Sequence, residues 1–295
     1  MRYVTEYECA IITPLFMGSA NPQQVELRVP SIKGGIRFWW RALHGNLDIK
    51  KLKEEEAKLF GSSDEKIGRS KLRIHIPVKQ IRTFGYPPFP HWEDKPNKRF
   101  FNSPAVGYGQ SFQVILTITS DEISHKKYQA IFEAALLLGG FGKRSRRGFG
   151  SIQITKRNGE VYQVPQDMDE LKNLLDRINP GCFSISDDGR KIVSEGFSGN
   201  YPYIKEIEIG KDYSNVDTLL KSISQATSVS ACDYLGFTKK IDKKSIRFAS
   251  PIFVSVIRRN RVWKPIITTL NTSFDPKYDV NKGTNNQESF KGAIL

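Results

Sequence analysis

The order of the predicted secondary-structure elements restricts the fold more than any other feature of this sequence. Alternating apolar residues predict strands, and apolar residues at three- and four-residue spacing predict helices. In the first half we expect strands at residues 3–12, 71–78, 111–119 and 151–155, and helices at residues 31–46, 51–60 and 128–138. Apart from the short extra helix, the order is strand, helix, strand, strand, helix, strand, which is that of a ferredoxin-like split unit.

The second half repeats these patterns less regularly. Asn158-Gly159 predicts a turn and a boundary. Beyond it we expect a helix at residues 167–178, a strand at 203–209, a helix at 216–229, and a hairpin of 246–258 with 261–270. The sequence therefore predicts an α+β fold of two ferredoxin-like (RRM-like) domains in tandem, with a first domain of residues 1–157 and a degenerate second domain of residues 158–295.

Residues 81–109 interrupt the first domain with five prolines placed among Phe84, Tyr86, Phe89, Trp92, Phe100 and Phe101. Neither a helix nor a central strand tolerates that density of proline, because proline lacks the N–H that both structures need. We predict an inserted loop or irregular hairpin, rich in proline and aromatic residues, and its role is open.

The charge of the chain points to an anionic partner. Its 295 residues include 45 Lys and Arg against 31 Asp and Glu, a formal net charge of +14. Nucleic acid is the first candidate, before an anionic protein or membrane surface. The sequence contains no run of 18 apolar residues, so we expect no membrane span. Residues 1–8 lack the apolar core of a signal peptide. Three separated cysteines make a disulfide framework or a zinc-thiolate site improbable, so we expect a cytoplasmic protein without a cofactor.

The helix expected at residues 31–46, with Ser31 as its N-cap, combines an apolar face with a basic one. At about 100° per residue, one arc holds the apolar core positions. The adjacent arc holds Lys33, Arg37, Trp40, Arg41 and His44. Cations beside an aromatic ring suit single-stranded RNA, whose phosphates they neutralise and whose bases stack. The alternative is a core helix with a basic outer face, in which Trp40 packs on a neighbouring domain.

A second basic cluster, GGFGKRSRRGFG at residues 139–150, holds Lys143, Arg144, Arg146 and Arg147. It is not a P-loop, because arginine follows the Gly-Lys pair, and it closes a predicted helix instead of opening one. Exposed backbone donors and arginines suit phosphate contacts. The alternative is a flexible, solvated turn.

Several motifs resemble the RAMP superfamily of CRISPR proteins, and within it the first subunits of the type III-B Cmr complex. They are ITPLFMG at residues 12–18, PSIKG at 30–34, RFWWR at 37–41, the glycine-rich loop 139–150, DYLGF at 233–237 and FASP at 248–251. The resemblance touches both halves of the chain and implies a non-catalytic subunit of two ferredoxin-like domains. Such a subunit helps to hold the 3′ part of the guide RNA and its paired target RNA beside other Cmr subunits.

By position, the resemblance implies that Lys33, Arg37, Trp40 and Arg41 line the RNA path. Arg144, Arg146 and Arg147 of the glycine-rich loop would contact the RNA backbone, and we include Lys143 of the same basic cluster as a candidate RNA-binding residue.

Two other functions stay open. Some RAMP relatives are metal-independent ribonucleases with a histidine near the first helix, so His44 is a candidate general base for processing guide RNA precursor. Nearby cations would lower its pKa, but no second acid or base stands at a recognisable spacing. The third possibility is a basic RNA scaffold unrelated to CRISPR.

Overall fold

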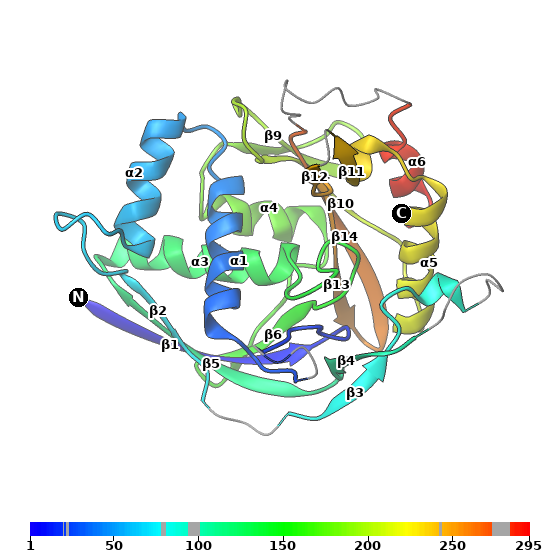
Figure 1. Cartoon of the computed structure of the whole chain (residues 1–295). Helices are drawn as coiled ribbons and strands as arrows, with labels where there is room; N and C mark the ends of the chain where they lie inside the picture. Colours follow the sequence, from blue (N-terminus) through cyan, green and yellow to red (C-terminus); the bar gives the residue numbers. More distant parts are fainter. Residues whose placement is uncertain (20, 22–23, 78–80, 94–100, 242–243, 273–283) are drawn as a thin grey trace.

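The computed structural model describes residues 1–19, 21, 24–77, 81–93, 101–241, 244–272 and 284–295. The fold is α+β, as expected, with two five-stranded antiparallel sheets and helices packed against them (Figure 1). Within the described residues, no helix is both long enough and apolar enough to cross a membrane.

The first sheet contains the four strands expected in the first half. In spatial order its strands are β2 (Leu72–His75), β5 (Ser111–Thr119), β1 (Arg2–Ile11), β6 (Ile152–Arg157) and the short β7 (Glu160–Val161). Tyr7 on β1 pairs with Val114 on β5, and both side chains are buried. The covering helices are α1 (Val29–Ala42), α2 (Ile49–Phe60) and α3 (Glu122–Leu138).

The proline-rich segment forms a two-stranded hairpin of β3 (Thr83–Tyr86) and β4 (Ser103–Val106), with a short 3-10 helix, η1 (Pro90–Trp92), between them. The helix η1 packs against α5 (Val216–Val229), where His91 Nδ1 lies 2.6 Å from Ser224 Oγ. The aromatic hairpin of the first half is therefore held against a helix of the second half.

The second sheet belongs to the second half of the chain. In spatial order its strands are β13 (Ile252–Arg259), β14 (Val262–Leu270), β10 (Ile204–Ile209), β9 (Lys191–Ser194) and β8 (Phe183–Ile185). Around it are α4 (Met168–Asp176), α5, η2 (Asp233–Leu235), α6 (Gln287–Gly292) and a separate hairpin of β11 (Phe237–Ile241) and β12 (Lys244–Phe248). The expected helix at 216–229 and strand at 203–209 are confirmed.

The expected strand at residues 246–258 is two strands, β12 and β13, which belong to different sheets. Pro251 lies in the break, where it needs no ladder hydrogen bond. The turn to β14 lies at Asn260, as predicted, and Asn260 and Arg261 have φ values of +48° and +64°. Two consecutive residues with positive φ are typical of a type I′ hairpin turn.

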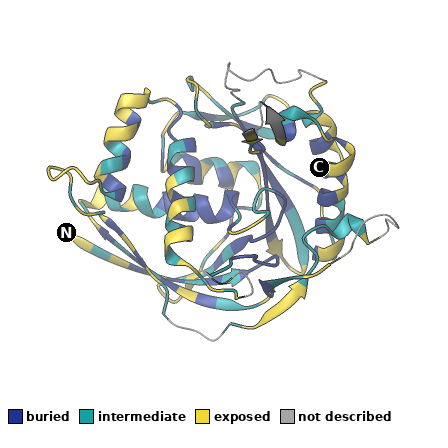
Figure 2. Ribbon diagram, viewed as in Figure 1, coloured by how far each residue is buried: buried dark blue, intermediate teal, exposed yellow. Residues whose placement is uncertain are grey.

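One hydrophobic cluster contains buried residues from both halves of the chain, and Figure 2 shows the buried segments in dark blue. Phe253 of β13 packs on Trp39 of α1, with the ring centroids 5.0 Å apart. The predicted boundary between residues 157 and 158 falls in the turn between β6 and β7, two strands that pair in the same sheet. The division into residues 1–157 and 158–295 stays a prediction.

Candidate nucleic-acid interface

The basic helix α1 begins earlier than expected. Its N-cap is Arg28, which makes no side-chain capping bond, and Pro30 lies in the first turn. Proline is favoured there because the first N–H groups of a helix lack intrahelical partners. The prediction of Ser31 as the N-cap is therefore wrong, and the helix ends at Ala42 instead of near Asn46.

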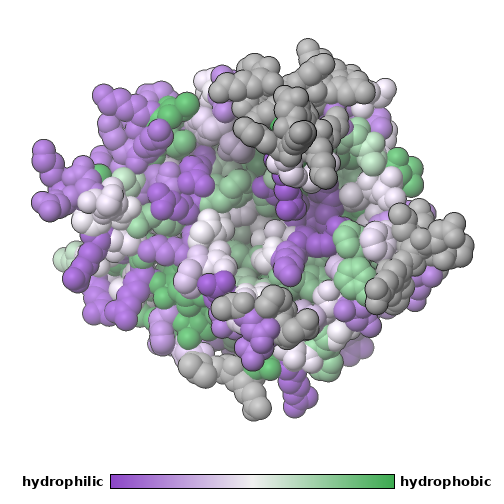
Figure 3. Space-filling view, in the orientation of Figure 1, coloured by the Kyte–Doolittle hydropathy of each residue, from purple (hydrophilic) through white to green (hydrophobic). Residues whose placement is uncertain are grey.

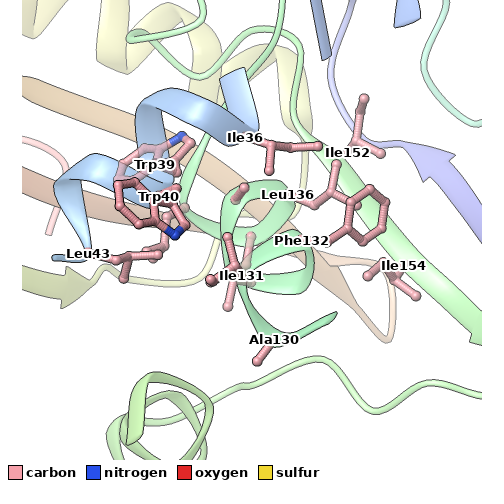
Figure 4. Close-up of a cluster of buried hydrophobic side chains, with 14 of the residues drawn as sticks. Ile36, Trp39, Trp40, Leu43, Ala130, Ile131, Phe132, Leu136, Ile152 and Ile154 are labelled. Atoms are coloured by element: carbon pink, nitrogen blue, oxygen red, sulfur yellow. The ribbon is translucent and has the colours of Figure 1, made fainter. Parts of the chain in front are cut away.

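The apolar face of α1 is confirmed, and Figure 4 shows several of its side chains against those of α3. The prediction for Trp40, however, is wrong. Its side chain is only 3% exposed, stacks on the His44 ring at 4.5 Å and lies 6.4 Å from the Phe60 ring of α2. Since α2 covers this side of α1, no base can stack on the Trp40 ring.

The cations of α1 have a counter-ion that the sequence analysis missed. Arg41 Nη1 donates to Glu56 Oε1 of α2 at 2.6 Å, and Arg37 Nε donates to the same oxygen. Glu56 is buried, whereas the Arg37 and Arg41 side chains are 46% and 39% exposed. The signal lay in α2, because Glu56 follows Leu52 at i+4 and so falls on the buried face.

Lys33 is held farther along the same helix. Its Nζ donates to Ser70 Oγ at 2.8 Å and to the Leu72 carbonyl at 3.1 Å. Burial, and then the charge of Arg37, lower the pKa of the Lys33 amine. Lys33 is therefore tied to the start of β2, beside the two arginines.

The glycine-rich loop 139–150 is a structured bridge, so the alternative of a flexible solvated turn is wrong. Gly148 N donates to the Val254 carbonyl at 2.9 Å, and Val254 N donates to the Arg146 carbonyl at 3.3 Å, so the loop adds to the edge of β13. Gly150 has φ +71°, and a Cβ there would overlap the Phe141 carbonyl oxygen. The loop path requires glycine at that position.

Two of the loop arginines are directed into the protein. Arg147 is 8% exposed, and it donates to the carbonyls of Arg146, Ile252 and Leu235 at 2.9–3.1 Å. This placement contradicts the predicted RNA contact of Arg147. Arg146 Nη1 donates to the Ser250 carbonyl, and its Cζ lies 4.4 Å from the centre of the Phe253 ring. Both arginines join the loop to the second half.

The other two cations of the loop are placed differently. Lys143 is exposed, and its backbone N–H donates to the Phe16 carbonyl at 2.8 Å. Arg144 turns toward the aromatic hairpin, where its Cζ lies 4.4 Å from the centre of the Phe89 ring. Burial lowers the pKa of the Arg144 guanidinium to about 10.

The fold brings the two basic clusters together. A Cβ at Gly35 of α1 would lie 2.7 Å from the Phe141 ring of the loop, so this glycine permits helix–loop packing. Gly34 faces open space, and Arg146 Cζ lies 5.9 Å from the centre of the Phe38 ring. Hydrophilic side chains gather over α2 and the adjoining part of α1 (Figure 3). Helix α1 and the glycine-rich loop, about one hundred residues apart in the sequence, therefore lie side by side.

His44 is placed in the core, at 3% exposure, with Nδ1 2.7 Å from the Trp40 carbonyl. Burial first, and then the charge of Lys127, lower its pKa to about 4. A general base for an RNA hydroxyl needs access to that hydroxyl, which this position does not offer. In the described residues no group of three His, Cys, Asp or Glu side chains could hold a metal ion.

Comparison with known sequences identifies relatives of this chain. The RAMP superfamily is the family whose model matches, over residues 8–153. The chain is 29% identical over 209 residues to the CRISPR system Cmr subunit Cmr1-1 of Pyrococcus furiosus, an alignment that covers 59% of this chain and 57% of that protein. It is 30% identical over 182 residues to Cmr1-2 of the same organism, covering 52% of this chain and 95% of that one. It therefore spans less than two thirds of the first relative and nearly all of the second.

Solved structures share the fold. Apo Cmr1 from Pyrococcus furiosus matches with a TM-score of 0.62 at 22% identity, over 99% of this chain and 96% of that chain. A chain of the type III-B Cmr-β complex bound to cognate target RNA matches with a TM-score of 0.58 at 12% identity, over 94% and 97%. At these identities the likeness concerns the fold alone.

Proposed function

The chain belongs to the Cmr1 family of the RAMP superfamily, and from this membership we propose that it is a non-catalytic, RNA-binding subunit of a type III-B CRISPR effector complex. Its ligands are the 3′ part of the guide RNA and the target RNA paired with it, and its protein partners are other Cmr subunits. We place this complex in the cytoplasm.

The observation that carries the RNA-binding role is the meeting of α1 with the glycine-rich loop. The cations that retain exposed surface there and are not tied to backbone carbonyls of the second half are Lys33, Arg37, Arg41, Lys143 and Arg144. Such cations bind phosphates without reading bases, so the proposed contact is independent of sequence. Trp40 and Arg147 support this surface from within instead of touching RNA, and the half-buried Arg146 is held by the Ser250 carbonyl.

The arrangement of both sheets favours two ferredoxin-like halves. In the first, β2-β5-β1-β6 has the order of such a unit, with the predicted elements in sequence. In the second, β13-β14-β10-β9 has the same spatial pattern, but β9 precedes β10 in the chain and occupies the place of the last strand. That substitution fits a degenerate second unit.

The test measures RNA affinity against salt concentration with the full chain and a labelled single strand of about 12 nucleotides. If about four phosphates are neutralised, log affinity falls with log salt at a slope of about −3. Arg37→Ala and Arg41→Ala each reduce that slope by about 0.7, whereas the exposed Arg190 of the β8–β9 turn, changed to alanine, leaves it unchanged.

A slope near zero, or equal losses in the Arg190 control, would contradict the proposed surface. The same RNA incubated in EDTA is expected to stay intact. Cleavage that disappears in His44→Ala would instead establish the ribonuclease alternative.

A further inference from the structure

A cavity of about 530 Å³ lies between the glycine-rich loop and the β3–β4 hairpin, outside the α1 surface. Its volume is in the range of small-ligand sites. Its lining comes from three separate parts of the chain: Phe16, Gly18, Val25, Pro88, Phe89, Phe101, Asn102, Ser103, Pro104, Lys143 and Arg144. We refer to it as the hairpin cavity.

Charge distinguishes the hairpin cavity from four other cavities formed by the described residues. Among the described residues, its lining includes two cations, Lys143 and Arg144, and no carboxylate. Four other cavities each include at least one acid, namely Glu93 and Asp217, Glu6 and Glu8, Glu133, and Glu160 and Glu170. The hairpin cavity is therefore suited to an anion.

Arg144 is the loop arginine left without an internal acceptor. Arg146 and Arg147 donate to backbone carbonyls, but Arg144 Nε is buried with no hydrogen-bond partner among the described residues. Its backbone has φ +62°, a region that arginine seldom adopts. Strained residues with unmet donors are common at ligand sites.

The cavity also has a fixed aromatic wall. The Arg144 guanidinium lies over Phe89, which stacks on Trp92 with a centroid distance of 4.3 Å. Phe101 lies 6.3 Å from Phe89 and is 41% exposed, so its ring has free surface. Asn102 and Ser103 supply a neighbouring amide and hydroxyl. Stacked rings position Arg144 before any ligand arrives, which lowers the entropy cost of binding.

From this combination we propose that the hairpin cavity binds one unpaired nucleotide of single-stranded RNA, with its base on Phe101 and its phosphate on Lys143 and Arg144. The proposal rests on the RNA-binding function above and gives the aromatic insertion a role in it. Base stacking on aromatic rings and phosphate pairing with adjacent cations are the two usual elements of such sites.

The test compares two variants with matched controls in the full chain. Phe101→Ala is expected to weaken binding of the single strand about tenfold and to leave the salt slope unchanged, because stacking does not release counter-ions. Arg144→Gly, which suits the positive φ, is expected to weaken binding and to reduce the slope by about 0.7. The controls are Phe84→Ala, an exposed ring of the same hairpin outside the cavity, and Arg190→Gly.

Uridine 5′-monophosphate and inorganic phosphate are titrated separately as probes. Tighter binding of the nucleotide than of phosphate, lost in both variants, supports the proposal even if the α1 surface fails its own test. RNA binding that responds to Arg37→Ala but not to Phe101→Ala or Arg144→Gly overturns the proposal and leaves the RNA-binding function intact. Equal binding of nucleotide and phosphate would identify a simple anion site and overturn it. The proposal would also be overturned if both variants kept RNA binding but no longer assembled with other subunits, because the occupant of the cavity would then be a protein.

Discussion

At the scale of single residues, His44 couples the stability of the fold to pH. Its pKa is about 4 in the folded protein against an ordinary value of 6.5, and burial is the main cause. The unfolded chain therefore binds a proton at a higher pH than the folded chain does. Its contribution is fully present above pH 6.5 and is lost as the pH falls toward 4.

We expect this histidine to account for about 3 kcal/mol of stability lost between these pH values. The measurement is urea unfolding of the wild type and of His44→Gln from neutral to acidic pH. Because acidic side chains also titrate in this range, the difference between the two curves isolates His44. If the free energies of unfolding of the two proteins changed in parallel with pH, His44 would not be the source of the pH dependence.

Glu56 holds two arginines of α1 in place and competes with phosphates for them. Glu56→Gln is expected to lower the free energy of unfolding by about 1 kcal/mol and to tighten RNA binding several-fold, since an ion pair of this kind contributes about that much. The control is Glu55→Gln on the same helix, because Glu55 pairs with Lys58 and its side chain is 45% exposed. Loss of affinity in Glu56→Gln would mean that the glutamate positions the arginines instead of masking them.

At the scale of elements, the glycine-rich loop is a connector between the two sheets. The Arg147 guanidinium donates hydrogen bonds to three backbone carbonyls, one in the first half of the chain and two in the second. Arg147→Ala leaves these buried acceptors without their charged donor, and we expect a loss of about 3 kcal/mol in the free energy of unfolding.

Chemical denaturation measures the effect of Arg147→Ala, and Lys143→Ala is the internal control. Lys143 is exposed in the same loop, so its substitution is expected to leave stability unchanged and to reduce only the salt slope, by about 0.7. Equal stability of the two variants would contradict the connecting role of Arg147.

At the scale of the whole molecule, the two halves stabilise each other. Phe253 packs on Trp39, and Ser255 Oγ donates to the Leu137 carbonyl of α3 at 2.6 Å. Ile12, directly after β1, belongs to a hydrophobic cluster whose other buried members lie beyond residue 215. Each half therefore buries apolar side chains against the other.

We therefore expect the full chain to unfold in one cooperative transition, observed by calorimetry and by circular dichroism alike. A fragment of residues 1–157 exposes the apolar surface that Phe253 covers and is expected to lack stable tertiary structure. Two separate transitions, or a fragment with cooperative unfolding, would contradict this expectation and support independent domains.

Much of the secondary structure could be predicted because it depends on local spacing. The expected strand at 111–119 and helix at 216–229 coincide with β5 and α5, and the turn at Asn260 is correct. Errors occurred where a neighbouring element changes what a position faces. Trp40 lies at the border of the apolar arc, and only the packing of α2 makes it a core residue.

The sequence alone determined the order of strands and helices around the first sheet, the excess of positive charge and the two basic segments. Only the tertiary structure decided which cations remain available to a ligand, because their partners come from distant segments. Arg147 finds its acceptors 88 and 105 residues away, and Arg37 and Arg41 find Glu56 on another helix. Local periodicity shows which side chains share a face of a helix, whereas the pairing of charges depends on what packs against that face.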